Sequence, residues 1–148
     1  IDGLADAAQR AAEAGAGFVV ITGGEPLHHD LQPLTEALDA RSGLPLHLET
    51  SGVDPLSGRF DWITLSPKRH LPPLQALLDQ MHELKVVIHA AEDLLFADAM
   101  AQAGQGEALH YLQPGWDSPE GQQLAIDHVR HNPTWCLSLQ THKWLGVR

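Results

Sequence analysis

Glycines and polar side chains follow the first apolar run of this chain. The run Phe18–Ile21 is partly β-branched, and Thr22-Gly23-Gly24-Glu25-Pro26 comes directly after it. Two adjacent glycines at the end of a strand let a ligand approach the backbone, whose N–H and C=O groups can hold a small polar molecule such as an amino acid. A plain tight turn is the alternative, because glycine is the usual turn residue. No Gly-Lys-Ser/Thr follows, which excludes a phosphate-binding P-loop.

Three further side chains could do chemistry beside such a turn. Glu49 lies at the end of a second apolar run, and its carboxylate could accept hydrogen bonds from an amine or from the edge of a guanine-like ring. Lys68, two residues after Ser66, could neutralise a carboxylate, and His142 could exchange a proton. Each of the three also has an ordinary alternative as an exposed surface residue.

Metal and thiol chemistry has little support in the sequence. The chain has ten histidines, but no pair combines a helical zinc spacing with a catalytic glutamate, so we expect no zinc site. Cys136 is the only cysteine and cannot form an internal disulfide, which fits a reducing cytoplasm. It lies inside an apolar strand pattern, so we expect a buried and inert thiol.

The composition is typical of one globular domain, which we expect to span residues 1–148. Hydrophobic residues make up 43%, and the formal net charge is −10 with nine scattered lysines and arginines. This charge argues against binding to nucleic acid or to an anionic membrane surface. No apolar run approaches the roughly 20 residues of a transmembrane helix. The start, Ile1–Leu4, resembles no signal peptide and lacks an initiator Met, so we interpret it as a point inside a longer protein.

Helix-forming and strand-forming segments alternate along the chain. Strands are predicted at residues 18–22, 46–50, 62–65, 84–88, 108–112 and 135–139. Helices are predicted at residues 4–14, 31–39, 73–82, 91–102 and 119–131. The link 52–61 is predicted to be non-helical, and the first strand is predicted to be buried on both faces. Such alternation indicates an α/β fold with a parallel sheet and helical crossovers.

The chemically interesting residues all lie at one end of these predicted strands. Parallel α/β folds bind their ligands at the carboxyl ends of the strands. Five of the six predicted strands end in glycines or polar groups, and we expect the opposite ends to lack them. The five segments are residues 22–26, 49–52, 66–68, 113–114 and 140–143. We therefore predict one shared pocket at this rim.

Taken together, these segments resemble one enzyme family. Thr22–Pro26 resembles the motif with which radical S-adenosylmethionine enzymes bind the methionine amine of their cofactor. The resemblance is narrowed by Glu49-Thr50-Ser51-Gly52, Ser66-Pro67-Lys68, Leu84-Lys85-Val86-Val87, Leu112-Gln113-Pro114 and the terminal run Leu139–Arg148. In that order they are similar to the 7-carboxy-7-deazaguanine synthase family of queuosine and 7-deazapurine biosynthesis, over nearly all 148 residues.

The resemblance implies a partial (β/α) barrel, a homodimer and a lyase reaction. In that reaction the ring of 6-carboxy-5,6,7,8-tetrahydropterin contracts with loss of ammonia. The reaction requires S-adenosylmethionine, a 4Fe-4S cluster, Mg²⁺ and an external electron donor. The implied S-adenosylmethionine-binding residues are Gly23, Gly24, Glu25, Ser66, Lys68 and Gln113. The implied residues at the pterin and its metal are Thr22, Glu49, His142 and Arg148, the last through its terminal carboxylate.

One departure from the family pattern is large. The family holds its cluster on three cysteines after the first strand of the barrel, whereas this chain has only Cys136. We expect the first strand, the cluster loop and the neighbouring magnesium residue to precede Ile1, and we expect the fragment alone to be inactive. Two alternatives stay open: another radical S-adenosylmethionine enzyme, such as an activating enzyme, and a non-catalytic module that binds a nucleoside or pterin. A purely structural role is a third possibility.

Overall fold

The computed structural model describes residues 1–147, and Arg148 lies outside the described residues. Six strands form one sheet in which every neighbouring pair is parallel and the spatial order follows the chain order. The strands are β1 (Val19–Ile21), β2 (Leu46–Thr50), β3 (Trp62–Leu65), β4 (Glu83–Ile88), β5 (Leu109–Pro114) and β6 (Trp135–Leu137). This sequential order is the arrangement of a (β/α) barrel, and it confirms the predicted parallel α/β class.

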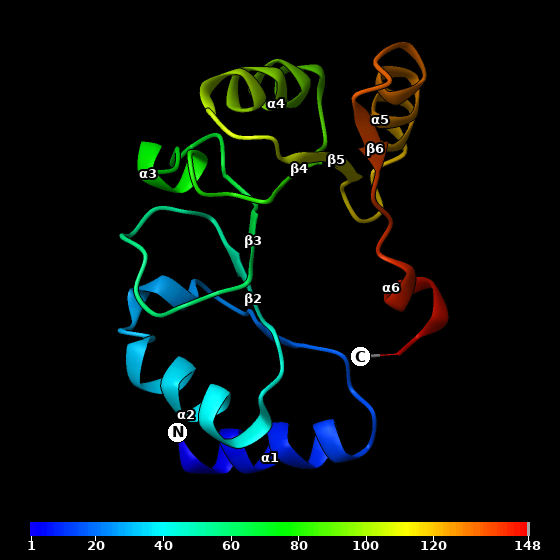
Figure 1. The fold of residues 1–148 in the computed structure, drawn as a ribbon. Helices are drawn as coiled ribbons and strands as arrows, with labels where there is room; N and C mark the ends of the chain where they lie inside the picture. The colour runs from blue at the N-terminus through cyan, green and yellow to red at the C-terminus, as the bar shows by residue number, and fades with distance from the viewer. Residues whose placement is uncertain (148) are drawn as a thin grey trace.

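Helices cover the outside of this curved sheet (Figure 1). They are α1 (Asp2–Glu13), α2 (Gln32–Ser42), α3 (Gln75–Leu78), α4 (Ala91–Ala103) and α5 (Pro119–His131). The short 3₁₀ helix η1 (Pro26–His28) follows β1, and the last helix is α6 (Thr141–Leu145). The link between β2 and β3 is non-helical, as predicted. In Figure 1 the sheet is curved, and α6 lies on its concave side. No helix within residues 1–147 has the length and apolar character needed to cross a membrane.

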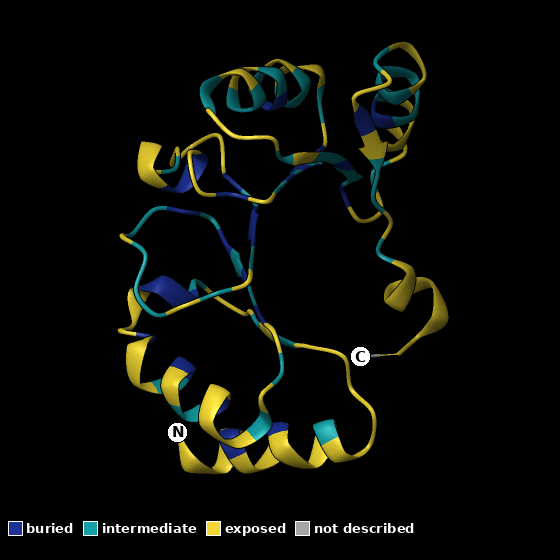
Figure 2. Ribbon diagram, in the orientation of Figure 1, coloured by how far each residue is buried: buried dark blue, intermediate teal, exposed yellow. Residues whose placement is uncertain are grey.

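The core lies between the convex face of the sheet and the helices. Alternate strand residues point into it, as in β2 and β4, and Figure 2 shows the buried positions on the sheet and on the inner faces of the helices. Its largest fully buried side chains are Leu48, Leu65, Leu77, Leu84, Ile88 and Leu112. The other strand residues point to the concave face, so each strand holds one set of side chains in the core and a second set on the concave face.

The first strand differs from its prediction. Phe18 is 52% exposed and Val20 is 43% exposed, so β1 is not buried on both faces. The reason is that β1 lies at an edge of the sheet and that these two side chains point to the concave face, which no helix within residues 1–147 covers at this edge.

The third helix is also shorter than predicted. It was expected at residues 73–82 but spans only Gln75–Leu78. Leu74 has extended backbone angles, and its N–H donates to the C=O of Gly52 over 2.8 Å, which holds it outside the helix. The predictions did not include η1 or α6, whereas β2, β3 and α5 have the bounds predicted for them.

Candidate functional site at the carboxyl ends of the strands

The Gly23-Gly24 turn follows β1 at the rim of the sheet. Gly23 has φ 102° and Gly24 has φ 58°, values in the left-handed region that favours glycine. A Cβ atom added at either position would meet no protein atom within 4 Å. The glycines are therefore required by the backbone path and not by close packing, and the space beside them is open to a small ligand.

Glu25 holds this turn against the end of β2. One carboxylate oxygen accepts hydrogen bonds from the Leu27 N–H (3.1 Å) and the Thr50 hydroxyl (2.5 Å). The other accepts from the Ser51 N–H (2.7 Å) and from the Ser51 hydroxyl. Burial by itself would raise the pKa of Glu25, but the hydrogen bonds from Ser51 and Thr50 outweigh it and lower the pKa. The ionised carboxylate thus joins the glycine turn to the neighbouring strand end.

Glu49 lies on the concave face of β2, between groups from two other strands. Its Oε1 is 2.6 Å from the Lys85 ammonium of β4, and its Oε2 is 3.4 Å from the Thr22 hydroxyl. Glu49 is 40% exposed, whereas the Lys85 side chain is only 16% exposed. The structure therefore brings the predicted residues Thr22 and Glu49 together and adds Lys85, which was not predicted as a site residue. In the sequence, the only indication of this role is that Lys85 alternates with the buried residues Leu84 and Val86 of β4.

Ser66 and Lys68 follow β3 and lie beside this group. The Lys68 ammonium donates to the Ser66 hydroxyl over 3.3 Å. Burial lowers the pKa of Lys68, the charge of Lys85 lowers it further, and the carboxylates of Glu25 and Glu49 act in the opposite direction. Lys68 therefore lies close enough to Glu25 and Glu49 for both charges to act on it. The Gly-Gly-Glu-Pro turn, the end of β2 and the end of β3 together form one polar rim.

Gln113 and His142 lie farther along the sheet. Gln113 is on β5 in register with Val87 of β4, two positions beyond the Lys85–Tyr111 pair, so it points to the same face near the same rim. His142 is exposed on α6, and within residues 1–147 no side-chain hydrogen bond joins it to the other predicted site residues. Arg148 lies outside the described residues, so its predicted role stays a prediction.

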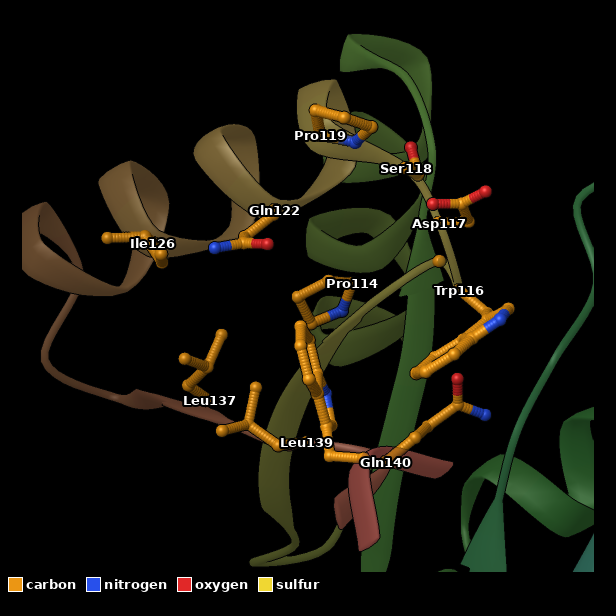
Figure 3. A pocket seen from close by; sticks show the side chains of 12 residues that line it. Pro114, Trp116, Asp117, Ser118, Pro119, Gln122, Ile126, Leu137, Leu139 and Gln140 are labelled. Atoms are coloured by element: carbon orange, nitrogen blue, oxygen red, sulfur yellow. The ribbon is translucent and has the colours of Figure 1, made fainter. Parts of the chain in front are cut away.

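A cavity of about 440 Å³ continues the rim between the loop after β5, helix α5, strand β6 and helix α6 (Figure 3). Ile126, Leu137 and Leu139 give it an apolar wall. The Trp116 and Trp144 rings meet edge to face with centroids 5.7 Å apart, which joins the β5–α5 loop to α6. The sequence predicted only the Pro114 and Gln140 edge of this cavity, because the residues of its apolar wall have no motif spacing.

The amino ends of the strands also carry polar groups on the concave face, so the prediction that they lack them was wrong. A second hollow of about 350 Å³ lies there, under Glu49. The rings of His47 and Trp62 stack with centroids 6.1 Å apart, and Glu83 lies beside them. Burial raises the pKa of Glu83, and the charge of Lys85 acts against this rise.

The described residues at the rim offer a small polar ligand both backbone and side-chain groups. The open glycine turn and the polar rim match a small zwitterionic ligand. In contrast, no group of three or more His, Cys, Asp or Glu side chains within residues 1–147 could hold a metal ion. Cys136 is exposed, so the prediction of a buried thiol was wrong. It points away from the core on β6, an edge strand whose concave side is uncovered.

A sequential parallel sheet with helices on its outer face and a polar rim at its strand ends defines a protein of the (β/α)-barrel class. No protein-family model matches the chain. Among curated proteins, the 7-carboxy-7-deazaguanine synthase of Prochlorococcus marinus is 47% identical over an alignment of 169 residues. This alignment, with its gaps, covers 99% of this chain and 75% of that protein. The synthase of Synechocystis sp. is 49% identical over 140 residues, covering 95% of this chain and 67% of the relative. The chain belongs to the 7-carboxy-7-deazaguanine synthase family.

A solved structure agrees with this assignment. The crystal structure of QueE from Escherichia coli superposes with a TM-score of 0.76 at 29% sequence identity, over 90% of this chain and 61% of that one. The similarity therefore extends over most of this chain, whereas the relatives contain further sequence that it does not match.

Proposed function

We propose that the protein containing this chain is a radical S-adenosylmethionine lyase that forms 7-carboxy-7-deazaguanine for queuosine biosynthesis. Its substrate in this proposal is 6-carboxy-5,6,7,8-tetrahydropterin, whose ring contracts with loss of ammonia. The observation that carries the proposal is the 47% identity to a named synthase over 99% of the chain. The open glycine turn and the polar rim support it, because they lie where barrel enzymes bind their ligands.

In this proposal the rim holds S-adenosylmethionine. Backbone groups of Gly23 and Gly24 bind its amino-acid end, in the turn that Glu25 fixes to β2. Ser66, Lys68 and Gln113 complete the site, and the Lys68 ammonium pairs with the ligand's carboxylate. S-adenosylmethionine, when bound and reduced, supplies the carbon radical that abstracts hydrogen from the substrate.

The same proposal assigns the pterin to the concave face beside Glu49. A carboxylate can accept two parallel N–H bonds from an amino-pyrimidine edge, so Glu49 selects and orients that edge. The Thr22 hydroxyl lies 3.4 Å from this carboxylate. The family resemblance also assigns His142 and Arg148 to the substrate site. The role of the site residues is to align the substrate and to exclude water from the reacting atoms.

The proposed enzyme also needs an iron–sulfur cluster and a metal ion, and the described residues provide no ligands for either. The family resemblance calls for a 4Fe-4S cluster and for Mg²⁺, but residues 1–147 offer neither three thiolates nor any group of three metal ligands. The described residues are therefore assigned no part in binding either group. An external electron donor, a homodimeric assembly and a cytoplasmic location complete the proposal.

Complementation tests this function in a cell. The gene that encodes this chain, expressed in an Escherichia coli strain without its own QueE, should restore queuosine, measured by mass spectrometry of digested tRNA. A Glu49→Gln variant should restore much less, and a Glu36→Gln variant on the outer helix α2 should restore as much as wild type. Normal expression without any queuosine would contradict the proposed reaction and favour the non-catalytic binding module.

A further inference from the structure

We propose that Lys85 is a positioning residue that fixes the Glu49 carboxylate so that its free lone pairs face the substrate. This inference rests on the proposed function, because it takes Glu49 as the group that binds the pterin edge. Lys85 itself touches Glu49 and not the reacting atoms.

The distances and the burial of the two side chains support this role. Lys85 Nζ and Glu49 Oε1 are 2.6 Å apart, the short distance of a charge-assisted hydrogen bond. The Lys85 side chain is 16% exposed and that of Glu49 is 40% exposed. The ammonium therefore has little access to water and depends on its carboxylate partner, whereas the carboxylate keeps an accessible side for a ligand.

The strand register explains how the two side chains meet. Glu49 of β2 is in register with Thr64 of β3, and Thr64 is in register with Glu83 of β4. Lys85 lies two residues beyond Glu83 on β4, so its side chain must cross β3 to reach Glu49. Thr64 is small enough to leave room on the concave face for this crossing and is itself only 5% exposed.

Two carboxylates compete for this one ammonium. Glu83 lies on the same strand face as Lys85, and the charge of Lys85 acts on its carboxyl group. Burial raises the pKa of Glu83, and the charge of Lys85 acts against this rise. The ion pair that Lys85 forms in the structure is with Glu49, at 2.6 Å.

Fixing the carboxylate matters because two parallel hydrogen bonds require its plane to match the plane of the ligand. A free glutamate side chain would lose rotamer freedom on binding. The Thr22 hydroxyl, at 3.4 Å from Oε2, is too distant to hold the carboxylate alone. Lys85 thus removes part of that entropic cost before the substrate arrives.

Equilibrium binding of the product tests this role without turnover. The probe is 7-carboxy-7-deazaguanine, titrated calorimetrically into the purified gene product that contains this chain. Lys85→Met should weaken binding about tenfold, and Lys85→Arg, which keeps the charge, should recover most of the loss. In the Glu49→Gln background, Lys85→Met should add less than about twofold, because the two residues act as one unit. Arg41→Met, which removes a cation bound to two carboxylates on the outer helices, is the matched control and should bind as wild type.

Kinetics of the reconstituted enzyme provide the second readout. Lys85→Met should raise the KM for the pterin by a larger factor than it lowers kcat, and Lys85→Arg should recover most of the KM. Product binding as tight as wild type, or an equal loss in the Glu49→Gln background, would overturn the inference. If Lys85→Met melts early, Lys85→Gln replaces it in the same comparisons. A wild-type protein that neither binds nor forms the product would instead overturn the proposed function itself.

Discussion

Replacing Glu25 by Gln tests whether this carboxylate holds the glycine turn. Each of its oxygens accepts one backbone N–H, from Leu27 at 3.1 Å and from Ser51 at 2.7 Å, and one hydroxyl. The amide of Gln would turn its NH₂ group toward one of these two N–H donors. The hydroxyls of Thr50 and Ser51 can rotate to accept, but a backbone N–H cannot.

The expected loss follows from the strength of these bonds. A hydrogen bond to a charged group contributes about 1.5–3 kcal/mol, and Glu25 is partly exposed, so we expect the free energy of unfolding to fall by about 2 kcal/mol. For a chain of this size that corresponds to a melting temperature lower by roughly 4–8 °C. Urea unfolding followed by circular dichroism measures the free energy directly.

The pH dependence has a defined sign. The pKa of Glu25 is lowered in the folded protein below its ordinary value of 4.5, so its contribution to stability is present above that value and is lost as the pH falls through the folded pKa. The difference between wild type and Glu25→Gln should therefore be full at about pH 7 and should shrink toward about pH 3. Glu36→Gln, whose carboxylate takes one exposed side-chain bond from Gln32, should change stability by less than about 0.5 kcal/mol. A loss for Glu25→Gln no larger than this control, or one that is constant with pH, would refute the reasoning.

Three further predictions concern two glycine positions and the exposed thiol of Cys136. Gly23→Ala should cost about 1–2 kcal/mol of unfolding free energy through its positive φ alone, whereas Gly3→Ala in α1 should be neutral or stabilising in the same assay. Gly121→Ala should lower the melting temperature because its Cβ would collide with the backbone C=O of Ile88, which cannot turn away; an unchanged melting temperature would contradict this contact. Cys136 should react with a thiol reagent without denaturant, and protection comparable to that of a core thiol would show that its exposure is misassigned.

Much of the fold could be predicted because its causes are local. The apolar segment Leu46–Thr50 and the proline-started segment Pro119–His131 have the bounds that their patterns predicted. Alternation of strands and helices fixed the parallel sheet, and the parallel sheet brought Thr22 and Glu49 to one rim. The third helix begins two residues later than predicted because the Leu74 N–H bonds to Gly52, a contact between distant residues that no local pattern contains.

The site was harder to predict where it depends on pairs of distant side chains. Lys85 and Glu49 are 36 residues apart, and only the strand register places one beside the other. The carboxylate of Glu25 could be expected near a ligand, but its bonds to Ser51 depend on how the first two strand ends approach. Cys136 has an apolar sequence neighbourhood, and its exposure follows from an uncovered concave face that the sequence does not describe.

The most direct test of the central claim is turnover by the purified gene product that contains this chain. After anaerobic reconstitution with iron and sulfide, the protein is incubated with S-adenosylmethionine, a reductant, Mg²⁺ and 6-carboxy-5,6,7,8-tetrahydropterin, and the products are measured by mass spectrometry. We predict 7-carboxy-7-deazaguanine together with 5′-deoxyadenosine, and a product yield at least about tenfold lower for Glu49→Gln. A reconstituted protein that yields neither compound would contradict the account.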